Sequence, residues 1–410
     1  MLRVDAERFR ADFEALAAIG ATADGGVHRP ALGEANLAAR AWFFERASAA
    51  GLETRVDAAG NHSAVLPAAS PDAPTLLLGS HLDSVPNGGR FDGALGVVAA
   101  LEVLRAVKDA GLELPVALEA IDFTDEEGTL VGLLGSYAVA GMLTPDLLGA
   151  PRGGRDALVA ALARAGLVEQ RLADARRDPV TLAGYLELHI EQGPVLEGAG
   201  ADIGIVTGIV GSRSFQLAFV GAAAHAGTTP MDARRDAALG AARFVAAAQS
   251  IVVEEFPGCV ATVGRVETEP GAFNVVAARA RLSLECRALE AERLGALERA
   301  LLGRAALEAE RARLELEVEP VGRWEPTPLD TDVQAAIERC VSELSLRALE
   351  LPSGAGHDAQ ALATVTRGGM IFVPSRAGIS HQPAEHTDWT DCVNGANVLL
   401  GAALELVSDR

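Results

Sequence analysis

Lysine is almost absent from this chain of 410 residues: Lys108 is the single lysine, and arginine supplies the remaining positive charge. Lys108 lies in LEVLRAVKDAG, a segment with the pattern of an ordinary amphipathic helix. Enzymes that form a Schiff base, or that bind phosphate through a P-loop, need a lysine in a reactive position. The sequence therefore argues against both kinds of chemistry.

Positive charge is scarce overall, because 35 Lys and Arg residues face 56 Asp and Glu residues, which gives a net charge of −21. Proteins that bind nucleic acids present clustered Lys and Arg side chains to the phosphates. We therefore expect a small-molecule substrate and no nucleic-acid partner.

Cysteines and long apolar runs are also few. The four cysteines lack CxxC spacing, which indicates reduced thiols and neither a disulfide framework nor a zinc knuckle: Cys259, Cys286, Cys340 and Cys392. No uninterrupted apolar stretch reaches the ~18 residues of a membrane span. Charges are spread through residues 1–20, which lack the apolar core of a signal peptide. We expect a cytoplasmic protein that does not bind membranes.

Strand and helix patterns alternate in the first half of the chain. The apolar segments 75–79 and 115–123 are typical of buried strands, and 96–110 has the pattern of a helix. The Ala- and Arg-rich stretch 152–177 is predicted to be helical, and 182–188 is a third strand. This alternation predicts an α/β domain with a doubly wound, mostly parallel sheet.

The pattern changes near Gly211. Two strand–helix–strand units follow, with helices predicted at 232–251 and 290–313, before the doubly wound pattern resumes beyond Asp330. Because 410 residues exceed one ordinary domain, we expect two. The prediction is a catalytic domain formed by 1–210 and 326–410, with a smaller α+β domain inserted at 211–325.

Polar residues follow the predicted strand 75–79. The sequence GSHLD places His81 and Asp83 two positions apart, so that they share a face of an extended chain at the edge where α/β sheets bind ligands. An imidazole can bind a metal while a carboxylate orients the ring. Asp92 follows closely in NGGRFDGALG. A polar turn, or a helix N-cap at Asp92, is the alternative explanation.

Three consecutive acids, Asp125, Glu126 and Glu127, follow the strand 115–123 in FTDEEG. Adjacent carboxylates at the end of a buried strand repel one another and are costly to desolvate. A solvated turn would accommodate them. A divalent metal explains them better, because it offsets the crowded charge and leaves one carboxylate free as a base.

Two further histidines follow apolar segments. His189 lies in LELHIEQGP, and His381 lies in PSRAGISHQPAE, after the strand-like residues 371–373. A single histidine at a strand end is more often structural than a ligand. Three imidazoles and two similarly placed carboxylates suit a pair of zinc-like ions, and the candidate ligands are His81, Asp92, Glu127, His189 and His381.

These motifs resemble the M20-type metallopeptidase and amidase superfamily. Within it, the chain is similar to the branch of N-carbamoyl-L-amino acid hydrolases, allantoate amidohydrolases and β-ureidopropionases. The blocks that carry the resemblance span about residues 79 to 388: GSHLDSVPNGGRFDGALGV, FTDEEG, LHIEQGP, GAAAHAGTTPM, SGAGHDAQ and PSRAGISHQPAE. The histidine in LHIEQGP favours the amidase branch over the peptidases.

The resemblance implies a role for each candidate in the metal centre. His81, Asp92 and His189 would hold one metal, and the second would be held by Asp92, Glu127 and His381, with Asp92 bridging. Glu126 would be the general base, and Asp83 would steer the ring of His81. The two metals would be divalent ions such as Zn²⁺, Mn²⁺, Co²⁺ or Ni²⁺. The resemblance also implies a cis peptide bond between Asp92 and Gly93.

The resemblance gives the inserted domain a lid and dimerisation role. His225 would reach across a homodimer to polarise the scissile carbonyl, and Asn274 and Arg287 would bind the carboxylate of the substrate. Arginine suits that role through its bidentate fork. Gln192 and Arg213 are further candidates for substrate contacts. Surface positions are the alternative for His225 and Arg287.

The expected activity is metal-dependent hydrolysis of the linear C–N bond in N-carbamoyl amino acids, releasing ammonia, carbon dioxide and an amino acid. Allantoate hydrolysis is one alternative, and an aminopeptidase or N-acyl-amino-acid deacylase is another. A non-enzymatic binding protein would be expected to lose Glu126, Glu127 or His225, and all three are present. The loop NVVAA and the run Ser212-Arg213-Ser214 depart from the branch and weaken the allantoate alternative.

Overall fold

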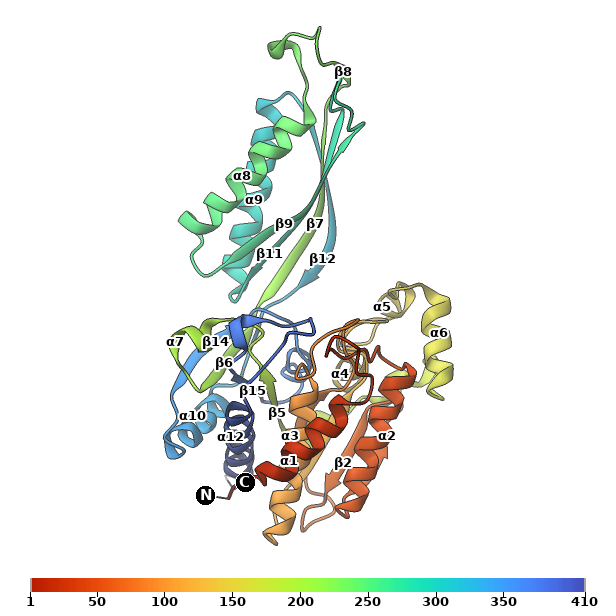
Figure 1. Cartoon of the computed structure of the whole chain (residues 1–410), viewed down its shortest axis with the longest axis vertical. Coiled ribbons are helices and arrows are strands. Elements are labelled where there is room, and N and C mark those ends of the chain that lie inside the picture. The colour runs from red at the N-terminus through yellow and green to blue at the C-terminus, as the bar shows by residue number, and fades with distance from the viewer. Residues whose placement is uncertain (1, 409–410) are drawn as a thin grey trace. The chain divides into compact units, whose positions relative to one another are not determined.

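The computed structural model describes residues 2–408 and divides the chain into two compact units. Unit 1 comprises Met1–Thr207 with Leu329–Arg410, and unit 2 comprises Gly208–Pro328. The segment predicted as the inserted domain, 211–325, lies within unit 2. The chain leaves unit 1 near the end of β6 (Ile203–Ile209) and returns to it before α10 (Thr331–Glu343), both labelled in Figure 1.

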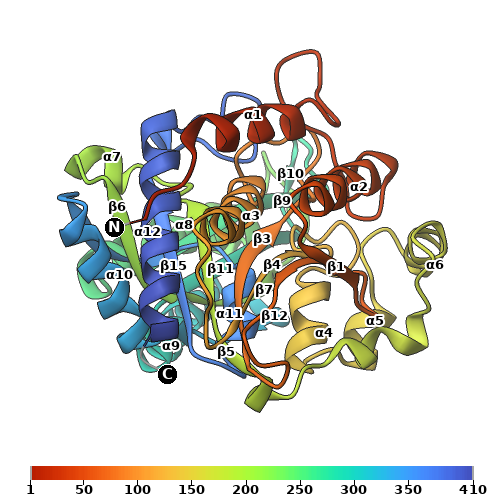
Figure 2. The same cartoon turned by 90° about the horizontal axis from the view of Figure 1, so that it is seen from below.

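A nine-stranded sheet forms the centre of unit 1 (Figure 2). Its strands, in spatial order, are β1 (Glu53–Val56), β2 (His62–Leu66), β4 (Ala117–Phe123), β3 (Thr75–His81), β5 (Leu182–Ile190), β15 (Gly368–Val373), β6 (Ile203–Ile209) and β13 (Thr327–Pro328), with β14 (Ala348–Ser353) beside β6. The four central strands β4, β3, β5 and β15 are parallel, and β1, β2, β6 and β13 pair antiparallel towards the edges.

Helices cover both faces of this sheet. Alternate residues of a strand point to opposite faces. On β5, Leu186 and Leu188 join the apolar cluster that contains α3 (Ala94–Asp109) and α12 (Trp389–Ser408). Glu187, between them, accepts a hydrogen bond from the backbone N–H of Ala359 in α11 (Asp358–Leu362). This confirms the predicted doubly wound, mostly parallel α/β fold.

The helices of unit 1 are α1 (Ala6–Ala17), α2 (Glu34–Ala49), α3 (Ala94–Asp109), α4 (Leu134–Ala140), α5 (Pro145–Gly149), α6 (Arg155–Arg164), α7 (Val195–Ala199), α10 (Thr331–Glu343), α11 (Asp358–Leu362) and α12 (Trp389–Ser408). Short 3₁₀ turns lie at Glu169–Ala175, Pro179–Thr181 and Arg376–Gly378. Helix α3 is buried at all but its last two residues, because it contacts the sheet, α1 and α12 together.

Unit 2 is an antiparallel sheet with two helices packed against it. The sheet runs in the order β12 (Glu315–Trp324), β7 (Gly211–Val220), β11 (Arg279–Ala288) and β9 (Val260–Glu269). The helices α8 (Ala237–Glu255) and α9 (Ala291–Arg311) form one apolar core with it. A small ladder joins β8 (Ala224–His225) to β10 (Val275–Val276), and a 3₁₀ turn lies at Met231–Ala233. The predicted α+β architecture is confirmed.

Helix α8 is the one described helix that is long and apolar enough to cross a membrane. Its apolar side contributes Phe244, Ala248 and Ile251 to the core of unit 2. A core helix of a soluble domain has this same composition, so α8 gives no support for a membrane span. The four cysteines are free and buried.

Candidate metal centre

The carboxyl ends of the central parallel strands bring the candidate ligands to one edge of the sheet. His81 is the last residue of β3 and lies opposite Phe123, the last residue of β4. His189 lies opposite Phe372 near the end of β5. Glu126 and Glu127 follow β4 after a tight turn, in which the carboxylate of Asp125 accepts N–H bonds from residues 130–132. The fold therefore gathers side chains that are distant in sequence.

The first donor set consists of His81, Asp92 and His189. Asp92 Oδ1 lies 3.1 Å from His189 Nε2 and 3.6 Å from His81 Nε2. All three side chains are buried, and one ligand atom of each lies within 4.8 Å of the others. Two imidazole nitrogens and a carboxylate oxygen at this spacing fit a divalent transition metal.

The second donor set consists of Asp92, Glu127 and His381. The other carboxylate oxygen of Asp92, Oδ2, lies 3.3 Å from His381 Nε2, and Glu127 Oε2 lies 3.7 Å from the same nitrogen. One ligand atom of each of these three residues also lies within 4.8 Å of the others. Since one oxygen of Asp92 faces each set, its carboxylate is placed to bridge two ions.

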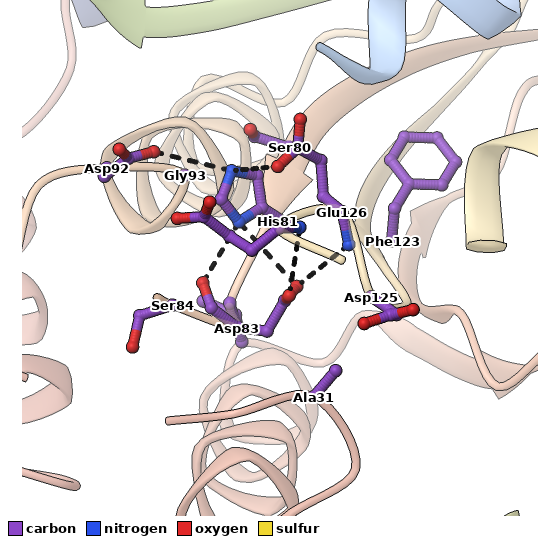
Figure 3. A network of polar contacts seen from close by, with 12 residues as sticks. Ala31, Ser80, His81, Asp83, Ser84, Asp92, Gly93, Phe123, Asp125 and Glu126 are labelled. Atoms are coloured by element: carbon purple, nitrogen blue, oxygen red, sulfur yellow. Dashed lines mark hydrogen bonds and ion pairs between the residues drawn. The ribbon is translucent and has the colours of Figure 1, made fainter. Parts of the chain in front are cut away.

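Two of the histidines present the same nitrogen towards the centre. His81 Nδ1 lies 3.1 Å from the main-chain oxygen of Asp83, and His189 Nδ1 lies 2.9 Å from that of Ile190. A proton on Nδ1 satisfies these oxygens and makes Nε2 the nitrogen that faces the donor set. In His189 this nitrogen also lies 3.2 Å from the backbone N of Gly93. Figure 3 shows the His81 ring with Asp83, Asp92 and Glu126 around it.

Gly93 follows the bridging carboxylate with a φ of 63°. A Cβ atom at this position would collide with the ring of His81, so only glycine fits. The cis bond recorded among the described residues is Glu269–Pro270. The expected cis bond between Asp92 and Gly93 is therefore wrong for this structure.

Asp83 connects the first ligand to the acids after β4. Its carboxylate oxygens accept N–H bonds from Glu126 and Glu127, at 3.3 and 3.2 Å. The same carboxylate lies 3.7 Å from His81 Nδ1, so it is placed to orient that ring, as the resemblance implies. Burial and the neighbouring Asp122 raise the pKa of Asp83 to about 7.

Burial also raises the pKa of Glu126 well above its usual value, and the charge of Glu127 adds to the effect. For Glu127 the causes are burial and Asp92. Burial alone would lower the pKa of His189, but its hydrogen bond to Asp92 and the charge of that carboxylate raise it to about 9. A bound divalent cation would oppose the raised carboxyl pKa values, because it favours the ionised forms.

Gln192 contacts the bridging carboxylate. Its Nε2 donates to Asp92 Oδ2 at 2.7 Å, and its backbone N–H donates to Ser375 Oγ. Its side-chain carbonyl oxygen is buried and has no hydrogen-bond partner among the described residues. A buried acceptor without a partner is costly, so Gln192 offers a site for an N–H group of a ligand.

His225 and Asn274 lie side by side in unit 2, because β8 and β10 pair and the N–H of Ala226 donates to the main-chain oxygen of Asn274. His225 is exposed, and its Nδ1 accepts N–H bonds from Gly227 and Thr228 at 3.1 and 3.2 Å. The proton of a neutral ring is then on Nε2, where it can be donated to a ligand oxygen.

Arg287 and Arg213 lie in the four-stranded sheet of unit 2, near the ends of β11 and β7 that are remote from β10 and β8. Arg287 pairs with Ser212 across the strands, and its guanidinium contacts Glu285 at 2.7 Å. Arg213 is 4% exposed and forms a two-oxygen contact with Glu325 at 3.0 Å. Arg213 is thus held within unit 2, whereas Arg287 is partly exposed.

Sequence reasoning did not identify three buried polar residues at the centre. Glu187 accepts bonds from Ser80 Oγ and the N–H of Ala359, and Glu385 accepts N–H bonds from Phe91 and Asp92. His357 packs edge-on against His189, with ring centroids 4.5 Å apart. The usable signals were an acid inside the apolar strand LELHI and the acid of HQPAE.

Comparison with known proteins places this geometry in a family. A sequence model of Peptidase family M20/M25/M40 matches residues 77–405. The chain is 39% identical to an N-carbamoyl-L-amino acid amidohydrolase of Geobacillus stearothermophilus, over 98% of this chain and 99% of that protein. It is 33% identical to an allantoate amidohydrolase of Bacillus subtilis, over 91% of each. The crystal structure of a hydantoinase/carbamoylase family amidase from Burkholderia multivorans superposes with a TM-score of 0.91 at 35% identity, over 99% of this chain and 98% of that chain.

The chain belongs to the M20 family of metallopeptidases and amidases. Its relatives in the carbamoylase group are amidohydrolases, and the chain is accordingly a hydrolase that acts on carbon–nitrogen bonds. The resemblance inferred from the motifs is confirmed.

Metal binding should strengthen as pH rises, because the carboxyl groups of the centre have raised pKa values. A buried acid such as Asp83, with its pKa raised to about 7, holds a proton in the folded metal-free protein that the unfolded chain has already lost. Its contribution to stability therefore falls as pH rises from about 4 to about 7. A metal requires ionised ligands and releases such protons. We expect Zn²⁺ or Co²⁺ to raise the melting temperature of chelated protein more at about pH 8 than at about pH 6, as measured by thermal unfolding. A metal-independent melting temperature would contradict the site.

Proposed function

We propose that this enzyme hydrolyses the linear C–N bond of N-carbamoyl-L-amino acids and releases ammonia, carbon dioxide and the amino acid. The observation that carries the proposal is the pair of donor sets that share Asp92 beside the buried carboxyl of Glu126. The 39% identity to an N-carbamoyl-L-amino acid amidohydrolase supports the carbamoyl substrate.

The residues on the two sets suit two divalent ions, such as Zn²⁺, Mn²⁺, Co²⁺ or Ni²⁺, which would lower the pKa of a water and polarise the scissile carbonyl. Glu126, 3.5 Å from His81 Nε2, takes a proton from the attacking water and returns it to the leaving nitrogen. The buried oxygen of Gln192 accepts an N–H bond from the carbamoyl group, which orients the scissile carbon.

His225 and Arg287 complete the proposed site from unit 2. The Nε2–H of His225 donates a hydrogen bond to the oxyanion of the tetrahedral intermediate. Electrostatic stabilisation of this kind is typically the largest single contribution to catalysis. Arg287 binds the carboxylate of the substrate through its planar fork, and Asn274 adds a hydrogen bond.

The positions of these residues favour a homodimer. Arg279 and Arg287 lie near opposite ends of β11 and are about 26 Å apart, at roughly 3.3 Å per residue. His225 and Asn274 lie close in sequence to the Arg279 end of β11 and its partner β7. A small substrate cannot touch both ends of one strand. In a two-fold dimer, one unit 2 supplies Arg287 and the unit 2 of the partner supplies His225 and Asn274. The dimeric enzyme is cytoplasmic, in keeping with four free cysteines.

Allantoate hydrolysis is the second candidate, because a relative with 33% identity is an allantoate amidohydrolase. The two substrates share a carbamoyl-type nitrogen group and a carboxylate, so the metal centre accepts both. The difference lies in unit 2, where Arg213 is held by Glu325 and offers no free cation to a larger ureido acid.

A panel of substrates tests the proposed activity. Ammonia release should be fastest with N-carbamoyl-L-amino acids, slower with ureidopropionate and allantoate, and lowest with N-acetyl amino acids and dipeptides. Glu126→Gln should retain the metal and the fold but lose roughly 10²–10⁴-fold in kcat, because the proton acceptor is gone. Preference for a dipeptide would favour a peptidase, and near-normal turnover of Glu126→Gln would remove Glu126 from the mechanism.

Mixing two inactive variants tests the shared site. His225→Ala and Glu126→Gln should each be inactive as homodimers. In a heterodimer with His225 acting in trans, one of the two sites contains both an intact base and an intact histidine, so subunit exchange should restore up to about half of the activity per dimer. A mixture whose exchange is verified by differential tags, yet stays inactive, would place His225 outside the partner's site.

A substitution on β11 tests substrate recognition. Arg287→Lys should raise KM by roughly ten- to hundred-fold, because an ammonium cannot form the forked contact and a charged hydrogen bond contributes about 1.5–3 kcal/mol. Arg281→Lys, at an exposed position six residues earlier on the same face, is the matched control and should leave KM unchanged. A carboxamide analogue should be a poor substrate of both proteins; equal penalties on acid and amide would assign Arg287 to the fold.

A further inference from the structure

A single main-chain position links the first metal ligand to the acids after β4. Leu82 lies between His81 and Asp83, and both neighbours contact the centre described above. The N–H of Leu82 donates to Asp122 Oδ1 at 2.7 Å, and its carbonyl oxygen accepts from Arg29 Nε at 3.0 Å. Both polar groups of this residue are therefore fixed by charged side chains.

Arg29 makes this contact from a distant part of the chain. Arg29 is 1% exposed. A second guanidinium nitrogen, Nη1, donates to the carbonyl oxygens of Leu16 at 3.0 Å and Ile19 at 3.4 Å, near the carboxyl end of α1. The carbonyls at a helix end lack partners within the helix and favour a cation. Arg29 thus joins the end of α1 to the loop that carries the metal ligands.

The backbone of Arg29 reinforces the contact. Its N–H donates to Ser84 Oγ at 2.9 Å, and its carbonyl oxygen accepts from the N–H of Ser84 at 3.0 Å. Residues 82 to 84 are therefore held from one side at three points. Figure 3 shows Ser84 beside Asp83.

A second arginine holds the opposite side. Arg40 Nε donates to Asp122 Oδ2 at 2.8 Å, and Arg40 Nη2 donates to Thr124 Oγ1 at 3.0 Å, just before the acids of the centre. The carboxylate of Asp122 therefore accepts from both Arg40 and the N–H of Leu82, and links the two. The two arginines and Asp122 fix the ends of β3 and β4 against each other.

We propose that Arg29 is a positioning residue of the metal centre: through the carbonyl of Leu82 it sets the directions of His81 and of Asp83, whose carboxylate holds the amides of Glu126 and Glu127. The inference rests on the proposed function of this centre. Arg29 and Arg40 precede residues 77–405, which match the family model, so the preceding segment contributes to a centre whose ligands all lie within the matched part.

The geometry explains why arginine occupies this position. Its fork places Nε and Nη1 on carbonyl oxygens of two different elements at once, which an ammonium on a flexible stem cannot reproduce. Removing the guanidinium would leave the carbonyls of Leu16, Ile19 and Leu82 without this donor, and the peptide between Leu82 and Asp83 would lose the side-chain contact that holds it. Loss of a group that orients a metal ligand typically costs 10–100-fold in metal affinity or activity.

Metal binding by Arg29→Gln and Arg29→Lys tests the proposal. Co²⁺ is titrated into chelated protein against a competing chelator, and its visible absorption bands report the ligand geometry. Arg29→Gln should bind Co²⁺ about 10–100-fold more weakly, with altered bands and a lower kcat at unchanged KM. Arg29→Lys should fall between Arg29→Gln and the wild type, because it keeps the charge but not the fork.

The matched control is Arg105→Gln. Arg105 is also buried, at 6% exposed, but it pairs with Asp12 at 2.6 Å among the helices and contacts no group of the centre. It should lower the melting temperature and leave Co²⁺ affinity and bands unchanged. If Arg29→Gln is not recovered folded, Arg29→Lys carries the same comparison.

The outcomes separate the two proposals. Wild-type Co²⁺ affinity, bands and kcat in a folded Arg29 variant that loses only thermal stability, as Arg105→Gln does, would overturn the positioning role. Absence of Co²⁺ binding by the wild type would instead contradict the metal centre itself, and with it the proposed function.

Discussion

The carboxylate of Asp92 is the group on which the rest of the centre depends. One oxygen faces His81 and His189, and the other faces His381 and Gln192. Each neighbouring element is shaped around this arrangement: the glycine after Asp92 leaves room for the His81 ring, and Glu385 holds the backbone N–H of Asp92. Moving this one carboxylate would disturb both donor sets.

The same arrangement concentrates negative charge where water is excluded. Asp83 is buried and Glu126 and Glu127 are largely buried near Asp92, and the pKa of each is raised by burial and by its acidic neighbours. Buried charge of one sign is costly unless cations offset it. Arg29 and Arg40, whose charges act on Asp83, are engaged with carbonyls and with Asp122. Divalent ions are therefore the natural counter-charge at the ligand side of the cluster.

The predictability of the fold followed the burial of each element. The central strands were predicted, because residues buried on both faces form short apolar runs such as 75–79. Strand β1 is exposed at all four positions and has no such pattern. The stretch 152–177 was predicted as helical throughout, but α6 ends before Gly166, whose φ of 69° breaks the helix, and only a 3₁₀ turn follows.

The candidate site was predictable to the extent that its residues stand at strand ends. His81, His189 and the acids after β4 were identified because they are polar residues at or just beyond the end of an apolar strand, where α/β sheets bind ligands. His357 follows a glycine-rich turn and Arg29 lies more than fifty residues before His81, so no local pattern connects either with the centre. Their roles come from contacts between segments that are distant in sequence, which only the three-dimensional fold supplies.

The two units divide the proposed chemistry in a way that local patterns could not reveal. Unit 1 holds both donor sets, the base and the acceptor of Gln192, which are the groups that bond cleavage requires. In unit 2, Arg287 lies near the end of β11, whereas His225 and Asn274 lie at the β8–β10 ladder, beyond the start of that strand. Under the proposed function, changes to Arg287 would alter which carboxylate is bound and would leave the donor sets of unit 1 in place. The same division would let one kind of metal centre serve relatives named as an N-carbamoyl-L-amino acid amidohydrolase and as an allantoate amidohydrolase, because the proposed carboxylate-binding residue lies in the other unit.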